Sequence, residues 1–169
     1  MKKTSNKNME ISPKQMQTLA HDFLVNQKTF KDLKGITDKE MEGIYATAYN
    51  FYTHGKFDRA NEIFSALCQM DPYKSKYWLG LGATRQMEKK YEKAIEAYGL
   101  ATIMDANNPL PPFYAAHCLM KLNEHDRATS AFETVIDLSK DKKEFKDLKT
   151  QAEQLLEGLR KKTTTQKSK

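Results

Sequence analysis

Small and aromatic residues recur along this chain every 34 positions, against a background of charged and polar residues. Alanines stand at positions 60, 94 and 128, and four residues after each comes an aromatic side chain. Twelve residues before each alanine stands another small residue. The members of this pattern are Ala60, Ala94 and Ala128, then Phe64, Tyr98 and Phe132, then Ala48, Gly82 and Ala116. Small residues let two antiparallel helices approach closely, and aromatic rings fill the space beside them.

This period and this arrangement are typical of the tetratricopeptide repeat. The predicted fold class is therefore all-α, with three tandem repeats forming an α-solenoid between an N-terminal helix and a C-terminal capping helix. Residues 37–140 hold the repeats, at about 41–74, 75–108 and 109–140. The predicted helix pairs are 38–54 with 57–70, 75–88 with 91–104, and 110–122 with 125–138. Thr37 and Glu40 form a capping box, and Gly55 and Asn123 end helices.

The segments outside the repeats differ in composition. Residues 1–11 are polar and predicted to be disordered, whereas 12–36 are predicted to form a helix and a link, with a capping box at 12–15. Residues 141–160 are predicted to form an amphipathic helix, capped by Asp141 and Glu144, that covers the last repeat. Residues 161–169 are predicted to be a basic, disordered tail.

The repeat positions also predict which side chains hold each helix pair together. They are Ile44, Thr47, Ala48, Phe51, Ala60, Phe64 and Leu67, then Trp78, Leu81, Gly82, Arg85, Ala94, Tyr98 and Ala101, then Pro112, Ala115, Ala116, Leu119, Ala128, Phe132 and Val135. Trp78, the single tryptophan, is thus expected in the core and not at a ligand.

A second face on the first helix of each repeat is predicted to line a groove. Tyr45, Tyr49 and Tyr52 share this face at spacing i, i+4, i+7. In the later repeats the corresponding positions hold Lys76, Leu79, Ala83 and Gln86, then Leu110, Phe113, His117 and Met120. Apolar side chains with a few polar ones suit an extended peptide. The alternative is that the N-terminal helix packs over the tyrosines.

Ala66 and Met70 lie outside the predicted packing set, near the convex side. They are a candidate self-association patch, although single exposed apolar residues are common on protein surfaces.

The formal net charge of +6 comes from the two ends of the chain. Without the eight Lys and Arg of residues 1–8 and 160–169, 20 basic residues face 22 acidic ones, a net charge of −2. Solvated tails explain this distribution, and contact of a tail with nucleic acid or anionic lipid is the alternative. No apolar run approaches the roughly 20 residues of a membrane span, and the start lacks the apolar stretch of a secretory signal. We therefore expect a cytosolic protein without membrane insertion.

Motifs that would indicate chemistry are missing from the sequence. Cys68 and Cys118 are not in C-x-x-C pairs and are predicted to be reduced core residues. The four histidines lack metal-ligand spacing, so neither metal nor cofactor is expected. No nucleophile elbow or phosphate loop indicates an enzyme, and Asp58 and Glu62 are interpreted as solvated charges.

Several longer segments resemble the class II chaperones of bacterial type III secretion systems. The segments are ITDKEMEGIYATAYNFYTHGKFDRANEIFSALCQMDPY, LGLGATRQMEKKYEKAIEAY, PPFYAAHCLMKL and KEFKDLKTQAEQLLEGL. The resemblance covers residues 16–160, and it includes segments outside the repeat positions, such as KDLKGIT.

This resemblance implies a chaperone that binds the two translocator proteins of the secretion system and keeps them soluble and apart. It implies that Tyr45, Tyr49 and Tyr52 hold an extended N-terminal segment of the translocator, with Leu79, Ala83, Phe113 and His117 extending the site. Members of the family commonly form homodimers, and several act as cofactors of a transcription activator. The family is usually acidic, whereas this chain is basic through its tails.

Two other functions remain as alternatives. A generic repeat adaptor that clamps a terminal carboxylate would need several Lys, Arg and Asn residues along the groove. Direct nucleic-acid binding would need a basic helix face interleaved with aromatics, and no such face is present.

Overall fold

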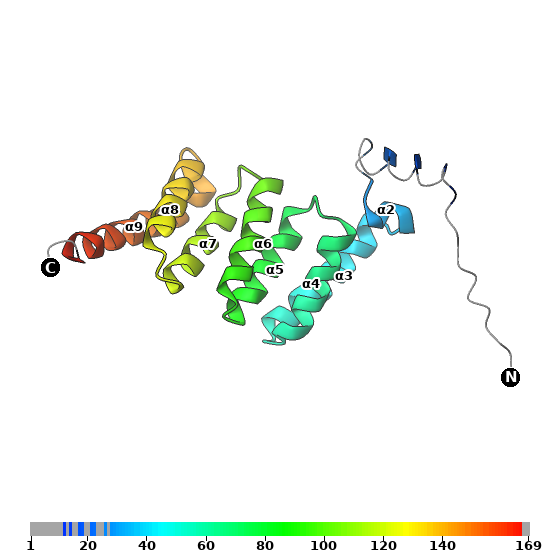
Figure 1. Cartoon of the computed structure of the whole chain (residues 1–169), viewed down its shortest axis with the longest axis horizontal. Helices are drawn as coiled ribbons and strands as arrows, with labels where there is room; N and C mark the ends of the chain where they lie inside the picture. Colours follow the sequence, from blue (N-terminus) through cyan, green and yellow to red (C-terminus); the bar gives the residue numbers. More distant parts are fainter. Residues whose placement is uncertain are drawn as a thin grey trace.

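The computed structural model describes residues 28–166 together with seven isolated residues nearer the N-terminus, and only the backbone of 162–166. The isolated residues are Ser12, Lys14, Gln17, Thr18, His21, Asp22 and Asn26. Helices stand side by side in a row, from α2 at one end to α9 at the other (Figure 1). Their bounds are α2 Phe30–Lys34, α3 Asp38–Thr53, α4 Phe57–Met70, α5 Ser75–Met87, α6 Tyr91–Met104, α7 Leu110–Lys121, α8 His125–Ser139, the 3-10 turn η1 Lys143–Phe145, and α9 Lys146–Gln166.

The predicted all-α class is confirmed, and the part of the chain that the structure describes contains no strand. The six helices from α3 to α8 begin and end within one residue of the ranges predicted from the sequence. Each neighbouring pair from α3 to α9 is in contact, and the first helices of successive repeats also touch, α3 with α5 and α5 with α7. These first helices therefore line the inner side of the stack.

A left-handed residue ends the first helix of every repeat. Gly55 (φ 71°), Lys89 (φ 60°) and Asn123 (φ 60°) occupy the same repeat position, 34 residues apart. Glycine and asparagine adopt this conformation readily, whereas lysine is strained in it. The backbone thus repeats even where the residue type does not.

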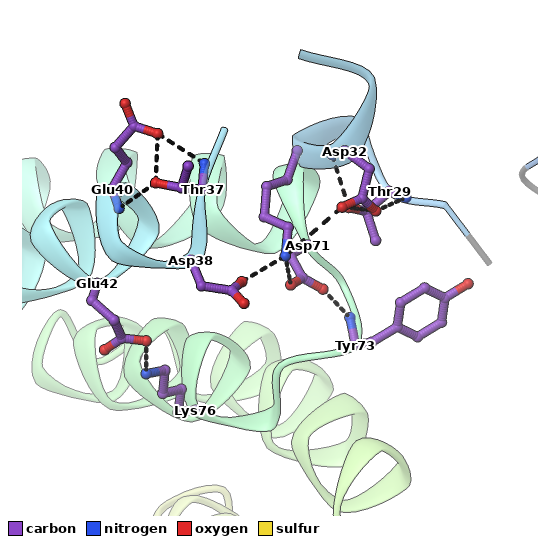
Figure 2. Close-up of polar contacts among 10 residues, drawn as sticks. Thr29, Asp32, Thr37, Asp38, Glu40, Glu42, Asp71, Tyr73 and Lys76 are labelled. Carbon is purple, nitrogen blue, oxygen red and sulfur yellow. Dashed lines mark hydrogen bonds and ion pairs between the residues drawn. The ribbon is translucent and has the colours of Figure 1, made fainter. Parts of the chain in front are cut away.

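Two capping boxes fix the N-terminal end of the described fold (Figure 2). At α3 the Thr37 hydroxyl accepts from the Glu40 amide, as predicted, and the Glu40 carboxylate accepts from the Thr37 amide at 2.8 Å. At α2 Thr29 and Asp32 make the same exchange, with a 2.7 Å bond from the Thr29 amide. Helix α2 was not predicted: it lies in the part of 12–36 for which the sequence indicated only a link after the N-terminal helix.

Lys31 joins α2 to the first repeat. Its Nζ lies 2.7 Å from an Asp38 oxygen and 3.4 Å from an Asp71 oxygen. Asp71 follows α4 and is 3% exposed, so its carboxylate is a buried charge that needs a cation close by. The ion pairs therefore hold α2, the start of α3 and the end of α4 together.

The predicted packing positions are mostly buried. The small residues Ala48, Gly82 and Ala116 are buried, and so are Ala60, Ala94 and Ala128 on the second helices. Glycine is needed where an aromatic ring packs directly against the backbone of the neighbouring helix. A Cβ on Gly80 would lie 2.3 Å from the Phe64 ring, and one on Gly82 would lie 2.6 Å from the Tyr98 ring. These contacts allow α4, α5 and α6 to pack closely.

Two predicted core residues are not in the core. Thr47 is exposed, and its hydroxyl donates to the carbonyl of Gly43 on the same helix. Arg85 is half-buried, and its guanidinium donates to the carbonyl of Lys93 at 3.0 Å. A polar group that finds a backbone partner near the surface has no reason to enter an apolar core.

The C-terminal boundary also differs from the prediction. The expected cap at Asp141 and Glu144 is wrong, because Asp141 is left-handed (φ 62°) and α9 begins only at Lys146 after η1. Helix α9 then continues to Gln166, into the range predicted as a disordered tail. An i,i+4 ion pair between Lys161 and Glu157 (2.7 Å) supports this extension.

The expected N-terminal helix falls largely outside the described residues. Residues 1–11 lie there, as do Pro13 and Gln15 of the predicted capping box and the apolar residues Met16, Leu19, Ala20, Phe23 and Leu24.

Candidate peptide-binding groove

The inner side of the stack holds a cavity of about 270 Å³ between the first and third repeats. We call it the tyrosine cavity. Its lining comes from every helix between α3 and α7, and consists of Tyr45, Tyr49, Tyr52, Phe64, Lys76, Leu79, Gly80, Ala83, Gln86, Tyr98 and Tyr114. No described residue of 12–36 lines it.

Three tyrosines of α3 form one wall of this cavity. The ring centroids of Tyr45 and Tyr49 are 6.5 Å apart and nearly parallel, and those of Tyr49 and Tyr52 are 6.3 Å apart. Tyr49 is 54% exposed, whereas Tyr45 and Tyr52 are half-buried. Burial raises the pKa of Tyr45 and of Tyr52, so their hydroxyls are neutral donors and acceptors at physiological pH. This wall matches the face predicted from the i, i+4, i+7 spacing.

Helix α5 supplies the opposite wall, where Leu79 and Ala83 lie as the sequence predicts. Between them Gly80 leaves room for the ring of Phe64 from α4, which meets Tyr45 edge-on at 5.8 Å. The middle of the cavity is therefore apolar and rigidly packed.

The deep end combines two tyrosines and an amide. The Tyr98 hydroxyl donates to Gln86 Oε1 at 2.6 Å, and the Tyr98 ring stacks on Tyr114 at 5.8 Å. The sequence analysis assigned Tyr98 to the core only, and it is fully buried. Tyr114 was not among the predicted groove residues; the same position holds Ala46 and Gly80 in the other repeats.

A lysine stands at the rim. Lys76 Nζ lies 4.7 Å from the centre of the Tyr45 ring and pairs with the carboxylate of Glu42 on α3 (Figure 2). Among the described lining residues it is the single charged side chain. The cavity thus has an apolar middle with one cation at its edge.

Phe113 and His117 do not line the tyrosine cavity. Phe113 is 6% exposed and packs against Phe132 at 6.0 Å, so the expectation that it faces the groove is corrected. The C-terminal core formed with α8 and α9 draws its ring inward. His117 is half-buried with its ring 4.7 Å from that of Phe113, and burial lowers its pKa.

The residues predicted to self-associate lie on α4. Ala66 is exposed, and Met70 is half-buried against the N-terminal core. Cys68, on the same helix, and Cys118 are buried free thiols, and burial raises their pKa to about 12 and about 11.

The described parts of the chain hold neither a membrane-spanning helix nor a metal-binding cluster. No helix there is long and apolar enough to cross a bilayer. Nor do His, Cys, Asp and Glu side chains of these residues gather in a group that could hold a metal ion.

Comparison with known proteins places this architecture among characterised relatives. The tetratricopeptide repeat family model matches residues 41–74 and 75–108, the ranges of the first two predicted repeats. Low calcium response locus protein H of Yersinia pestis is 38% identical over 144 residues, 85% of this chain and 86% of that protein.

Solved structures agree with this relationship. A type III secretion system complex from Aeromonas hydrophila has a TM-score of 0.84 and 35% identity, over 87% of this chain and 98% of that one. The Yersinia enterocolitica type III secretion chaperone SycD, solved with a peptide of the translocator YopD, has a TM-score of 0.73 and 38% identity, over 76% and 98%. SycD has also been solved as an alternative dimer. The resemblance inferred from the sequence is thereby confirmed, and the chain belongs to the tetratricopeptide-repeat family of type III secretion translocator chaperones.

Proposed function

We propose that this protein is a bacterial cytoplasmic chaperone that binds hydrophobic translocator proteins of a type III secretion system. It would keep them soluble, separate and competent for export, by holding an extended N-terminal segment of each in the tyrosine cavity. The observation that carries this proposal is the cavity itself, with tyrosines from all three repeats around an apolar middle. In the relative SycD, the ligand is a translocator peptide.

The chemistry of the lining suits such a segment. Tyrosine rings offer apolar contact at a low cost in side-chain entropy, and their hydroxyls can bond to a peptide backbone. An extended chain directs alternate side chains to opposite sides, so every second one can enter the cavity. Tyr45, Tyr49, Tyr52, Leu79 and Ala83 would contact these side chains. His117, half-buried on α7, would extend the surface beyond the cavity.

The same lining argues against the adaptor alternative. Clamping a terminal carboxylate requires several positive groups, and Lys76 is the single cation among the described lining residues. As a chaperone, the protein needs no catalytic activity, and we propose none.

The energetics favour a complex that can be released. Burying apolar surface contributes about 25 cal/mol per Å². Ordering a disordered segment offsets part of that gain. Moderate affinity is therefore expected, as release before export requires.

The proposal is tested by replacing Tyr45, Tyr49 and Tyr52 together with alanine. The test measures the affinity of a fluorescent YopD peptide by anisotropy. Removal of three aromatic contacts should weaken binding by about 3 kcal/mol, while helical circular dichroism stays near that of the wild type. Tyr73→Ala is the matched control, because Tyr73 is 48% exposed and lies outside the cavity. Unchanged affinity in a folded triple variant would refute the assignment.

We also propose that the free protein is a homodimer in which the α4 surface around Ala66 and Met70 takes part. The exposure of Ala66 beside the partly exposed Met70 supports this surface. Sedimentation velocity of the variant with Ala66→Glu and Met70→Glu should show a shift from dimer to monomer. A variant that remains dimeric would place the interface elsewhere.

A further inference from the structure

The rim of the tyrosine cavity carries one positive charge, that of Lys76, although binding of apolar side chains in the middle of the cavity does not require a charge. Lys76 begins the α5 wall, and its Nζ lies 4.7 Å from the Tyr45 ring centre and 5.6 Å from that of Tyr77. Cation–π contacts hold an ammonium group above a ring face. The side chain is thus kept over the cavity edge instead of extending into solvent.

The partner of Lys76 inside the protein is Glu42. The two residues occupy the same position in successive repeats, 34 residues apart, and the pair bridges α3 and α5 (Figure 2). Lys76 lines the cavity and Glu42 does not. A bound segment would therefore meet the ammonium group, with the Glu42 carboxylate behind it.

Exchange of this partner is physically easy. The side chains of Lys76 and Glu42 are 40% and 56% exposed, and ion pairs between exposed side chains contribute little to stability. A carboxylate brought by a segment that also covers the Tyr45 ring would sit in a less hydrated place, where attraction to the same ammonium group is stronger. In the free protein, the Glu42 carboxylate therefore occupies the place beside Lys76 that a carboxylate of the ligand would take in the complex.

We propose that the segment bound in the tyrosine cavity carries an aspartate or glutamate side chain that pairs with Lys76 and displaces Glu42. This inference rests on the proposed function and specifies its ligand: an extended segment with apolar side chains for the cavity and one acidic side chain at the α5 rim. Lys76 is then a residue that sets specificity, and Glu42 a competitor within the protein.

The experiment uses the full chain and a set of fluorescent peptides based on the YopD peptide, in which each position in turn is Glu or Gln. With the wild type, one position should bind about fivefold more tightly as Glu than as Gln. Lys76→Met should abolish this preference, and Glu42→Gln should enlarge it about twofold. Lys74→Met is the matched control, because Lys74 is exposed and does not line the cavity; it should leave the preference unchanged.

The Glu and Gln peptides have side chains of nearly the same size and differ in charge. Any loss of packing against the Lys76 side chain in Lys76→Met therefore affects both peptides equally, and the change in their affinity ratio reports the charge alone. If no position shows a preference that Lys76→Met removes, the inference is overturned, while tyrosine-dependent binding would leave the proposed function standing. If no peptide of the set binds the wild type, the proposed function fails, and the inference fails with it.

Discussion

Gly80→Ala tests whether the close contact between α4 and α5 sets the stability of the repeats. The added Cβ would lie 2.3, 2.6 and 2.8 Å from three atoms of the Phe64 ring. Carbon atoms in contact are about 3.5–4.0 Å apart, so the ring or the helices must separate by about 1 Å. Phe64 is 1% exposed, and its ring is packed against Tyr45 at the wall of the tyrosine cavity.

The expected loss follows from two opposed effects. Overpacking of a core costs about 1–3 kcal/mol, whereas alanine is better than glycine inside a helix by about 1 kcal/mol. We therefore expect Gly80→Ala to lower the free energy of unfolding by up to about 2 kcal/mol. Peptide affinity should fall as well, because Phe64 and Gly80 both line the tyrosine cavity.

Gly99→Ala is the matched control. Gly99 lies inside α6, and a Cβ there would meet nothing within 4 Å. This variant should gain up to about 1 kcal/mol from helix propensity alone. Urea unfolding followed by circular dichroism measures both variants. If Gly80→Ala proves as stable as Gly99→Ala, the argument from close packing is refuted.

Three further changes test the turns and the N-terminal contacts. Lys89→Gly should raise the free energy of unfolding by about 0.5–1 kcal/mol, because Lys89 is left-handed where the first repeat has Gly55; a less stable variant in urea unfolding would contradict this. Lys31→Met should cost about 1–3 kcal/mol by removing the cation beside the buried Asp71. Adding Asp71→Asn should recover part of that loss, and no recovery would show that charge is not the cause. The pKa of Asp32 is lowered from 3.8, first by the backbone amide and then by the hydroxyl of its N-cap residue. A carboxylate with a depressed folded pKa stabilises above its unfolded pKa and loses this effect as pH falls through the folded value. The free energy of unfolding should therefore depend less on pH between about pH 5 and 2 in Asp32→Asn than in the wild type. Identical pH profiles would show that the hydrogen bonds between Asp32 and Thr29 do not stabilise the fold.

The helix pairs could be predicted from the sequence because the repeat constrains the chain at several places at once. A small residue, an aromatic residue and a turn recur together every 34 positions, so an error in one element would misplace the others. Lys89 shows the strength of this constraint: the turn is left-handed there although the residue type does not favour it. By contrast, the capping pattern at Asp141 stands outside the repeats, and a local pattern alone did not predict the turn.

The groove was predictable in part. The tyrosines of α3 were found because their spacing puts them on one helix face. Phe113 has the equivalent position in the third repeat, but the C-terminal core that includes α9 buries it, and the period does not extend to that helix. Tyr114 was not predicted to line the groove. The same position of the second repeat is Gly80, which has no side chain and so gives no sign in the sequence that this position faces the groove.

The contacts that hold the repeats together also hold the rings of the cavity in place. Gly80 admits Phe64 and Gly82 admits Tyr98, and both rings lie between packed helices while reaching the cavity. A ligand would not have to order these rings, so less of its binding free energy would be lost to entropy. Substitutions at either glycine should consequently change stability and affinity together. Tyr49, 54% exposed at the open edge, should change affinity alone, and this contrast separates the scaffold of the cavity from its contact surface.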